Sequence, residues 1–377
     1  MSRPGVCFGG PSPEHDISIL TGLQAVHALA EAGRDPVALY WSPNGTWHEV
    51  PADLEAAAFA DGLPSGATAV ELLSRPGGGF VRGGRRPKRA GVDLSVVVNC
   101  CHGGPGEEGA LAAQFDLAGL PYTGPSQRSA AISMDKLAFT GAVAAAGLPT
   151  LPLWLLTDDL RAEGLAAELV KGPLIVKPRF GGSSIGIEIV ADLATAQALA
   201  QTSLLLRDGA VVQRYLTDVI DLNISVRTWP QLRLSAVERP LRSADAEIYT
   251  YADKYLVGGG GMATAARELP ATLPAPVESA LRAAAVEVSH LVMARSVMRI
   301  DFLWDGGDDP NRLWVNEINP IPGSLSWYFW SGEGDSLIEL LDDLIAEALD
   351  GPTRHFVTQG ADGTALRSVG TIAAKLA

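Results

Sequence analysis

The sequence predicts a protein that joins an α/β unit, built on a parallel sheet, to a longer α+β part. Two patterns carry this prediction. Over residues 1–125, short apolar segments bounded by glycine alternate with segments of helical periodicity, and this alternation is typical of a parallel sheet covered by helices on both faces. Beyond residue 125, apolar segments come in pairs around turns rich in Gly, Ser, Asp or Pro, which favours antiparallel hairpins.

The N-terminal unit is expected to end near Pro125. Its strands are predicted at 5–10, 34–41 and 92–104, each a short run of apolar residues. Its helices are predicted at 12–33 and 107–119, where apolar residues recur every three or four positions and Gly33 and Gly119 act as stops. We therefore assign the first domain to residues 1–125.

The second part opens with a helix predicted at 134–146. Two strands within 173–190 are joined by a glycine-serine loop at 181–186, and Asp192 is a candidate N-cap for the next helix. Further strands are predicted at 209–216, 297–304 and 313–319, and a last helix at 335–349. We assign a central domain to 126–213 and a C-terminal domain to 214–350, and leave the tail at 351–377 unassigned.

Composition excludes several classes of function. The 377 residues carry a formal net charge of −14, which disfavours nucleic acid and anionic membranes as partners. No apolar run approaches the roughly 20 residues of a membrane helix, and the N-terminus does not read as a signal peptide, so a soluble, cytoplasmic protein is expected. The three cysteines, Cys7, Cys100 and Cys101, are expected to be buried free thiols. The basic segment 75–91 is expected to form a surface hairpin.

The residue pattern around 297–319 indicates a cation site. Strand periodicity in a symmetric hairpin sets Asp301 opposite Glu317 and Arg299 opposite Asn319. Because like charges directly opposed destabilise a sheet, a cation between the acids would explain the pattern. Two carboxylates and an amide oxygen suit Mg²⁺ that also holds phosphate oxygens. The alternative is a solvated polar face.

A second pattern indicates phosphate binding. Lys177 ends an apolar strand just before the glycine-serine loop, whose backbone N–H groups can approach phosphates closely. Lys136 and Lys254 are further candidates. Four glycines at 258–261 suggest a lid over the site, although a surface loop would have the same composition.

Two other enzyme classes fit less well. Residues 104–109, GPGEEG, match a dinucleotide-binding pattern, but Glu107 and Glu108 would repel a pyrophosphate at the helix N-terminus. Residues 182–186, GSSIG, match the GxSxG pattern of many serine hydrolases, but they join two predicted strands, whereas the nucleophile elbow lies between a strand and a helix.

Seven motifs together resemble one family. In chain order they are FGGPSPEHDIS, HGGPGEEGALAAQFDLAGLPYTG, SMDKLAFTGAVAAAGLP, VKPRFGGSSIG, YADKYL, MRIDF and NEINPIPG. Their order and spacing resemble those of the D-alanine–D-alanine ligases, which belong to the ATP-grasp superfamily. The resemblance implies a three-domain ATP-grasp architecture, with ATP between the central and C-terminal domains. It also implies amino-acid substrates, an acylphosphate intermediate, a role in peptidoglycan biosynthesis and the homodimer that is usual in the family.

The resemblance also assigns roles. The nucleotide would be contacted by Lys136, Lys177, Ser184, Gln213, Tyr215, Leu216, Asp221 and Lys254. Mg²⁺ would be held by Asp301, Glu317 and Asn319. Glu14 would receive the ammonium of the first substrate, Ser183 and Tyr255 would link it to the lid, and Arg299 and the N–H of Gly323 would stabilise the oxyanion. His102 would stand near the substrates. Two simpler roles remain: His102 could cap the following turn, and Glu14 could be a solvated acid.

This chain departs from the family pattern at several positions. Gln213 stands where a glutamate usually meets adenine, Asp221 where a longer glutamate meets the ribose, and Gly181 where a glutamate is common. After Gly323 the family usually has small or polar residues for the second substrate, whereas this chain has SLSWYFW, which places Tyr328 and Phe329 as candidate substrate contacts. The same aromatics could instead be core. A ligase of specialised metabolism that joins other amino acids or closes a ring on an intramolecular amine therefore stays open beside the D-alanine reaction, as does a silent nucleotide-binding protein.

Overall fold

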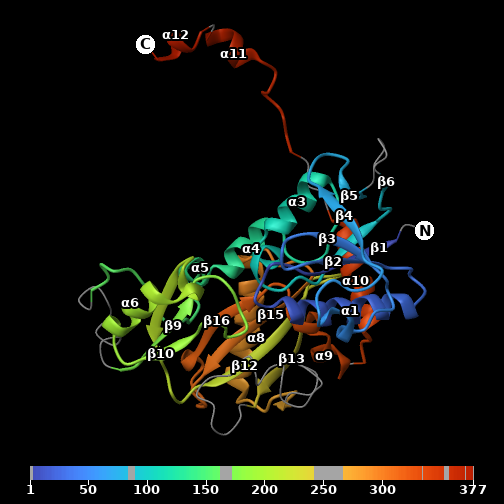
Figure 1. The fold of residues 1–377 in the computed structure, drawn as a ribbon. Coiled ribbons are helices and arrows are strands. Elements are labelled where there is room, and N and C mark those ends of the chain that lie inside the picture. Colours follow the sequence, from blue (N-terminus) through green and yellow to red (C-terminus); the bar gives the residue numbers. More distant parts are fainter. Residues whose placement is uncertain are drawn as a thin grey trace.

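The computed structural model describes residues 3–83, 90–161, 172–241, 266–332, 334–351, 356–369 and 371–376. Its strands form three sheets, of seven, four and five strands, with helices packed against them (Figure 1). Lys254 and Tyr255, and the glycines at 258–261, lie outside the described residues. The three sheets follow the order of the three predicted domains; the domain boundaries stay a prediction.

The N-terminal sheet has a parallel centre. Strands β1 (Pro4–Gly9), β2 (Val37–Trp41) and β7 (Val96–Asn99) pair in parallel, as the sequence predicts. Four further strands extend the sheet on one side with antiparallel pairing: β3 (Trp47–Val50), β4 (Thr68–Leu73), β5 (Gly79–Arg82) and β6 (Ala90–Gly91). The predicted basic hairpin corresponds to β5 and β6, and the residues between them, 84–89, lie outside the described part.

Helices cover both faces of this sheet. On one face, α1 (His15–Glu31) packs together with α10 (Leu337–Asp350), so that Leu23 and Val26 share a core with Leu340 and Leu344. On the other face lies α3 (Ala110–Ala118), which buries Phe115 beside Cys7. The short helices η1 (Ala56–Phe59) and α2 (Gly104–Glu107) complete the unit. All three cysteines are free and buried, as expected.

The central unit contains an antiparallel sheet in the order β10-β9-β11-β8. Its strands are β8 (Trp154–Leu155), β9 (Leu174–Pro178), β10 (Glu188–Val190) and β11 (Ala210–Arg214). Helix α6 (Leu193–Thr202) and η4 (Leu204–Leu206) cover it, and Asp192 caps α6 by accepting from the N–H of Thr195, as predicted. The helix predicted at 134–146 corresponds to α5 (Lys136–Ala145). A helix that was not predicted, α4 (Gln127–Met134), precedes it, and the two are separate because Asp135 leaves the helical conformation to cap α5.

The C-terminal sheet has the order β14-β13-β12-β15-β16. Its strands are β12 (Ile220–Arg227), β13 (Arg233–Pro240), β14 (Arg267–Glu268), β15 (Val297–Trp304) and β16 (Leu313–Asn319). Helix α8 (Ala275–Leu291) buries Leu281 and Val288 against it. Short helices η6 (Pro310–Arg312), η7 (Gly323–Ser326) and α9 (Trp327–Ser331) flank β16, and α11 (Thr364–Val369) and α12 (Ile372–Leu376) end the chain.

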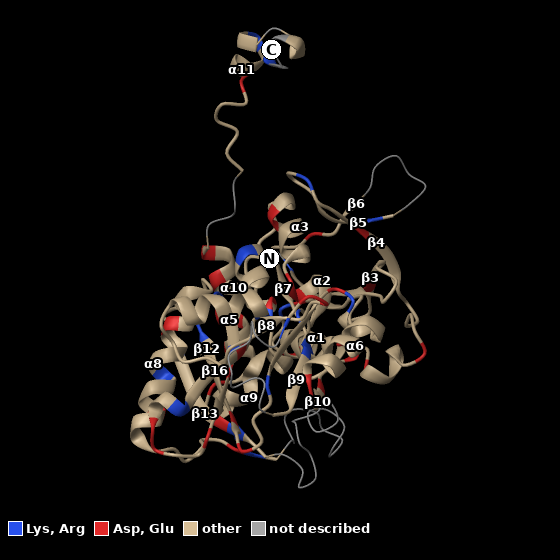
Figure 2. Ribbon diagram, turned by 90° about the vertical axis from the view of Figure 1, so that its left-hand side faces the viewer, with Lys and Arg blue, Asp and Glu red and all other residues tan. Residues whose placement is uncertain are grey.

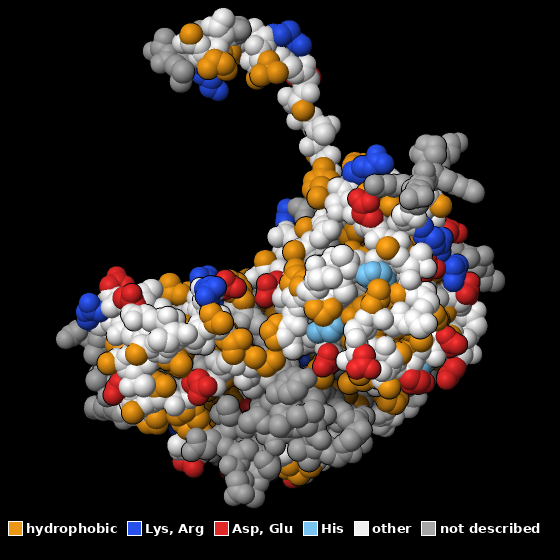
Figure 3. Space-filling model, viewed as in Figure 1, with side chains coloured by type: hydrophobic (Ala, Val, Ile, Leu, Met, Phe, Trp, Pro, Cys, Tyr) orange, Lys and Arg blue, Asp and Glu red, His pale blue; other side chains and the backbone are white. Residues whose placement is uncertain are grey.

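Charged residues occur on many elements of the described chain. Lys and Arg positions are spread over several elements of the ribbon (Figure 2). Hydrophobic and acidic side chains are interspersed on the face shown in Figure 3. Among the described residues, no helix has the length and apolar character needed to cross a membrane.

Candidate active site

The hairpin of β15 and β16 has the register that the sequence predicts. Arg299 pairs with Asn319 and Asp301 with Glu317. Met298, Ile300, Phe302 and Trp304 are buried on the opposite side, in the core under α8. The polar side chains therefore share one face at the end of the hairpin.

Asp301 is held by its neighbours on this face. Arg299 donates to both carboxylate oxygens of Asp301, from Nε and from Nη2, at 2.7 Å each. The side-chain amide of Asn319 donates to Oδ2 of Asp301 at 3.0 Å. Arg299 is 7% exposed, so a paired charge lies at the edge of a largely dry site, where electrostatic interactions are strong.

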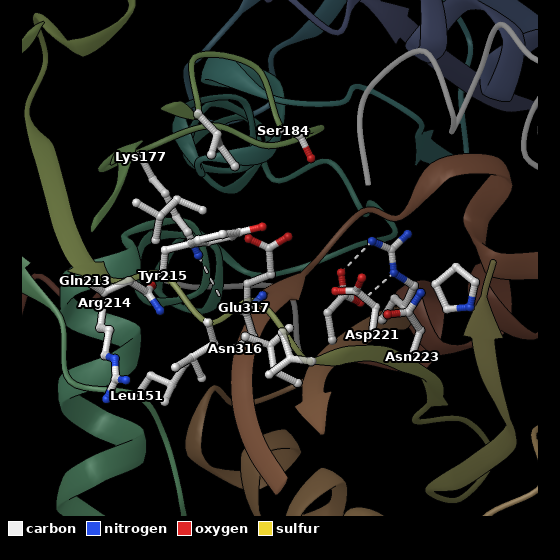
Figure 4. Close-up of a pocket in the computed structure, with 18 of the residues that line it drawn as sticks. Leu151, Lys177, Ser184, Gln213, Arg214, Tyr215, Asp221, Asn223, Asn316 and Glu317 are labelled. Carbon is white, nitrogen blue, oxygen red and sulfur yellow. Dashed lines mark hydrogen bonds and ion pairs between the residues drawn. The ribbon is translucent and has the colours of Figure 1, made fainter. Parts of the chain in front are cut away.

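A β-bulge adds Asn316 to the site. The register of β15 and β16 shifts after Asp301, so that Glu317 pairs with Asp301 and Val315 with Phe302. The extra residue, Asn316, lines the same pocket as Glu317, as expected where a bulge redirects a side chain. Lys177 donates to Oδ1 of Asn316 at 3.5 Å, and the two side chains point toward each other beside Glu317 (Figure 4).

The main pocket lies between the central and C-terminal sheets (Figure 4). One wall comes from β9 and β11 and the segment after it, the other from β12, β15 and β16. The predicted site residues that line it are Lys177, Ser184, Gln213, Tyr215, Leu216, Asp221, Arg299, Asp301 and Glu317. The structure thus brings together most of the predicted nucleotide contacts and two of the predicted metal ligands.

Two lysines stand at the closed end of this region. Lys177 is buried, and burial lowers the pKa of its ammonium; the charge of Glu317 opposes this effect and that of Lys136 adds to it. Lys136 donates to the carbonyl oxygen of Gly181 and lines an adjoining pocket with Glu14, Glu317 and Asn319. A phosphate group would relieve the repulsion between the two cations.

The glycine-serine loop reaches the N-terminal unit. Ser183 and Ser184 have left-handed backbones, with φ of 51° and 59°. The hydroxyl of Ser183 donates to Oε1 of Glu14, which lies just before α1. Glu14 is buried, so the alternative of a solvated acid is wrong.

A smaller pocket adjoins the first at Arg299. It is lined by Glu14, His102, Glu107, Ser183, Arg299, Asn319, Ile321, Pro322 and Gly323. Both oxygens of the buried Glu107 accept backbone N–H groups, from Gly103 at 2.7 Å and from Ile321 at 2.9 Å. Burial, together with the charge of Glu14, raises the pKa of Glu107 to about 8. A cationic ligand would stabilise these two carboxylates.

His102 is buried and neutral. Its Nδ1 donates to the carbonyl oxygen of Ile321 at 2.7 Å, and its Nε2 lies 2.8 Å from Oγ1 of Thr21. Burial, and secondarily the charge of Arg299, lowers the pKa of His102 to about 4. The alternative role as a cap is wrong, because both ring nitrogens of His102 are engaged by Ile321 and Thr21 and not by the following turn.

The aromatic segment after Gly323 is core. Tyr328, Phe329 and Trp330 are buried around the half-buried Leu269. The guanidinium of Arg267 lies 4.2 Å from the centre of the Tyr328 ring, and Trp330 donates to the hydroxyl of Ser225 at 3.1 Å. Neither Tyr328 nor Phe329 lines either pocket described above, so their contact with substrate stays a prediction.

Sequence reasoning missed several residues of the site. Asn316 was hidden by the bulge, since strict alternation places it on the other face. In the sequence, Glu107 indicates only an obstacle to dinucleotide binding, although an acid five residues after His102 in the same motif is a usable signal. Thr21 carried no signal, because a threonine inside an apolar helix has many ordinary explanations.

The main pocket lies between two antiparallel sheets and contains a buried lysine, two opposed carboxylates and a serine of the glycine-serine loop. This arrangement is that of an ATP-grasp enzyme that forms C–N bonds. The comparisons agree. Residues 3–125 match the family model described as the D-ala D-ala ligase N-terminus, and residues 143–346 match the one for its C-terminus. The chain belongs to the D-alanine–D-alanine ligase family, whose members are ATP-dependent ligases.

Relatives support this assignment over nearly the whole chain. The D-alanine–D-alanine ligase of Prochlorococcus marinus strain MIT 9303 is 32% identical over 369 residues, covering 91% of this chain and 97% of the relative. Among solved structures, D-alanyl-alanine synthetase A from Vibrio cholerae has a TM-score of 0.74 at 20% identity, over 93% and 99% of the two chains. The VanG D-Ala:D-Ser ligase from Enterococcus faecalis has a TM-score of 0.69 at 23% identity, over 92% and 99%. These two likenesses show the fold.

Proposed function

We propose that this chain joins two amino acids, with D-alanine as the first substrate, in an ATP-dependent reaction that passes through an acylphosphate. The observation that carries the proposal is the meeting of two pockets at Arg299. The larger pocket has the lysine and amide groups that suit a nucleotide, and the smaller one has the buried acids that suit an amino acid's ammonium group. Arg299 lines both, where a carboxylate and a phosphate would meet.

The larger pocket would hold ATP. ATP supplies the phosphoryl group that converts a carboxylate into an acylphosphate. Lys177 and Lys136 would neutralise its phosphates, and the amide oxygen of Gln213 can accept from the adenine amino group. Asp221 would meet the ribose.

The floor of this pocket fits Mg²⁺. Asp301 and Glu317 face each other with Asn319 beside them, and oxygen donors of this kind are those Mg²⁺ prefers. Turning over the amide of Asn319 would present its oxygen instead of its N–H₂, since the two are nearly isosteric. The ion would add positive charge beside the phosphate oxygens.

The smaller pocket would hold the first substrate. Glu14 would bind its ammonium group, and Ser183 would keep Glu14 in place. In the second half-reaction, the amine of the acceptor attacks the acyl carbon, and a tetrahedral oxyanion forms before phosphate leaves. Arg299 and the N–H of Gly323 would stabilise that oxyanion.

The site residues constrain the identity of the second substrate less than that of the first. The bulky Tyr328 and Phe329 stand where the family usually has small or polar residues, and this observation favours, as a second candidate, a ligase with the same donor half and another acceptor. The homodimer of the family remains part of the proposal.

The test is phosphate release from ATP and Mg²⁺, measured with D- and L-amino acids singly and in pairs, with the dipeptide identified by mass spectrometry. Turnover with D-alanine alone supports the first candidate. Turnover only when D-alanine is paired with another amino acid supports the second. Absence of turnover with every pair, despite nucleotide binding, would overturn both.

A further inference from the structure

The loop that carries Gly323 has a conformation that its own sequence does not favour. The three residues after Gly323 have left-handed backbones, with φ of 50° at Ser324, 49° at Leu325 and 53° at Ser326. None of them is glycine, so each adopts a conformation that L-residues avoid. Contacts from elsewhere in the fold must therefore hold the loop in this shape.

Those contacts come from side chains of the N-terminal unit. On one side of Gly323, the N–H of Ile321 donates to Oε1 of Glu107 at 2.9 Å, and its carbonyl oxygen accepts from Nδ1 of His102 at 2.7 Å. On the other side, the N–H of Ser324 donates to Oγ1 of Thr21 at 3.0 Å. Both flanks of Gly323 are thus anchored.

The hydrogen-bond directions of this set are determined. The carbonyl oxygen of Ile321 can only accept, so Nδ1 of His102 carries the proton, and Nε2 of the neutral ring accepts. Thr21 therefore donates its hydroxyl proton to Nε2, at 2.8 Å, and its oxygen receives the N–H of Ser324. Thr21, His102 and Glu107 are all buried, with exposed fractions of 2%, 3% and 5%, so water does not compete for these bonds.

We infer that Thr21, His102 and Glu107 form a clamp that positions the Gly323 N–H for the developing oxyanion. All three are positioning residues. The inference rests on the proposed function, and it gives His102 and Glu107 a task beyond lining the pocket of the first substrate. Thr21 acts at one remove: it fixes the backbone at Ser324 and the tautomer of His102, which in turn fixes Ile321.

The test compares Thr21→Val with Thr21→Ser. Valine has the shape of threonine without the hydroxyl, whereas serine keeps it. A misplaced oxyanion donor weakens binding of the transition state more than that of the substrates. Thr21→Val is therefore expected to lower kcat by about 10- to 100-fold, at or below the roughly 100- to 1,000-fold that complete loss of one such donor costs. KM for ATP and for the first substrate should stay within about twofold. Thr21→Ser should restore most of the rate.

A matched control is Thr228→Val. The hydroxyl of Thr228 likewise makes a hydrogen bond within the fold, donating to Oε1 of Glu347 at 2.7 Å with the carbonyl oxygen of Ser296 at 3.1 Å, but Thr228 lines neither pocket. The Thr228→Val variant should be less stable than the wild type and should have the same kcat. If Thr21→Val does not fold, Thr21→Ala removes the same hydroxyl from a smaller side chain. A rise in KM with unchanged kcat in the folded variant would overturn the inference.

Hydrogen exchange tests the clamp without turnover. In the unliganded protein, a peptide spanning 321–326 should exchange slowly, and Thr21→Val should speed its exchange, whereas Thr21→Ser and Thr228→Val should not. Equal exchange in Thr21→Val and the wild type would overturn the clamp even in an active enzyme. Slow exchange in a protein that turns over no amino-acid pair would overturn the proposed function and leave the clamp supported.

Discussion

Asp301 and Glu317 lie directly opposite each other on β15 and β16, with only Asp301 in a bidentate pair with Arg299. Two carboxylates in this relation repel each other unless a cation joins them. We expect Glu317→Gln to reduce turnover at least 100-fold, because it removes an anionic ligand of Mg²⁺. Steady-state rates over a Mg²⁺ titration check this. Near-normal activity would contradict the metal assignment.

Thermal unfolding separates this effect from damage to the fold. Without metal, Glu317→Gln removes both the repulsion from Asp301 and the attraction to the buried Lys177, so its Tm should stay close to that of the wild type. The stabilisation by Mg²⁺ and nucleotide seen in the wild type should be reduced in the variant, because a ligand stabilises only the state that binds it. Asp308→Asn is the control: Asp308 is exposed at the tip of the same hairpin and should change neither quantity.

The contact between Glu14 and Ser183 leads to a second prediction. Glu14→Gln should lower kcat/KM for the first substrate by about 10- to 100-fold, because a charge-assisted hydrogen bond to the ammonium is worth about 1.5–3 kcal/mol. KM for ATP should change little. Ser183→Ala should have a smaller effect in the same direction. Glu31→Gln, on the exposed end of α1, is the control, and a similar loss there would show that the effect is not specific to the site.

How far the sequence predicts this site depends on the range of the interactions that build it. The pairing of Asp301 with Glu317 is readable locally, from a symmetric hairpin and the two-residue period of strands, although the bulge shifts the register by one residue on the turn side, where Trp304 pairs with Leu313. The caps at Asp135 and Asp192 are local as well. The bulge at Asn316 cannot be predicted from the sequence, because no residue pattern marks it and it depends on how β16 packs within the fold.

Long-range contacts account for the rest. Glu107 meets Ile321 across 214 positions and Thr21 meets Ser324 across 303, distances over which residue types alone indicate nothing. In the antiparallel extension of the first sheet, β3 and β4 were also missed, because strands of four and six residues have little detectable periodicity. The roles of Glu14 and Arg299 follow from the family resemblance and not from the local residue pattern.

The hydroxyl of Tyr328 leads to a third prediction. It is buried and has no hydrogen-bond partner among the described residues, and an unpaired buried hydroxyl costs about 1–3 kcal/mol. Tyr328→Phe should therefore raise the free energy of unfolding of the unliganded protein by about 1 kcal/mol. If the hydroxyl binds the second substrate, the same change should raise KM for that substrate by about 3- to 10-fold, as the loss of one neutral hydrogen bond does.

Tyr122→Phe is the matched control for this substitution. The hydroxyl of Tyr122 donates to Oδ1 of Asp116 at 3.2 Å, so its removal should lower stability rather than raise it. Denaturant unfolding and acceptor titrations on both variants measure the two effects. A stabilised Tyr328→Phe with unchanged KM would assign the aromatic segment to the core alone.

The buried His102 makes stability depend on pH. Its pKa falls from the ordinary value of 6.5 to about 4 in the folded protein, chiefly through burial. As pH falls through this range, the unfolded chain takes up a proton at His102 and the folded protein does not. The contribution of His102 to stability is therefore intact above about pH 6.5 and is lost progressively down to about pH 4, by about 3.5 kcal/mol at about 1.4 kcal/mol per pH unit.

His102→Gln removes this component, because glutamine does not titrate. We expect urea unfolding at pH 7.5 and pH 5 to show a smaller pH dependence in His102→Gln than in the wild type, whatever the variant's absolute stability. His290→Gln, which changes an exposed histidine of α8, should keep the pH dependence of the wild type. An equal pH dependence in His102→Gln and the wild type would mean that His102 takes up its proton in the folded protein, and the direction of its hydrogen bond with Thr21 would then be reversed.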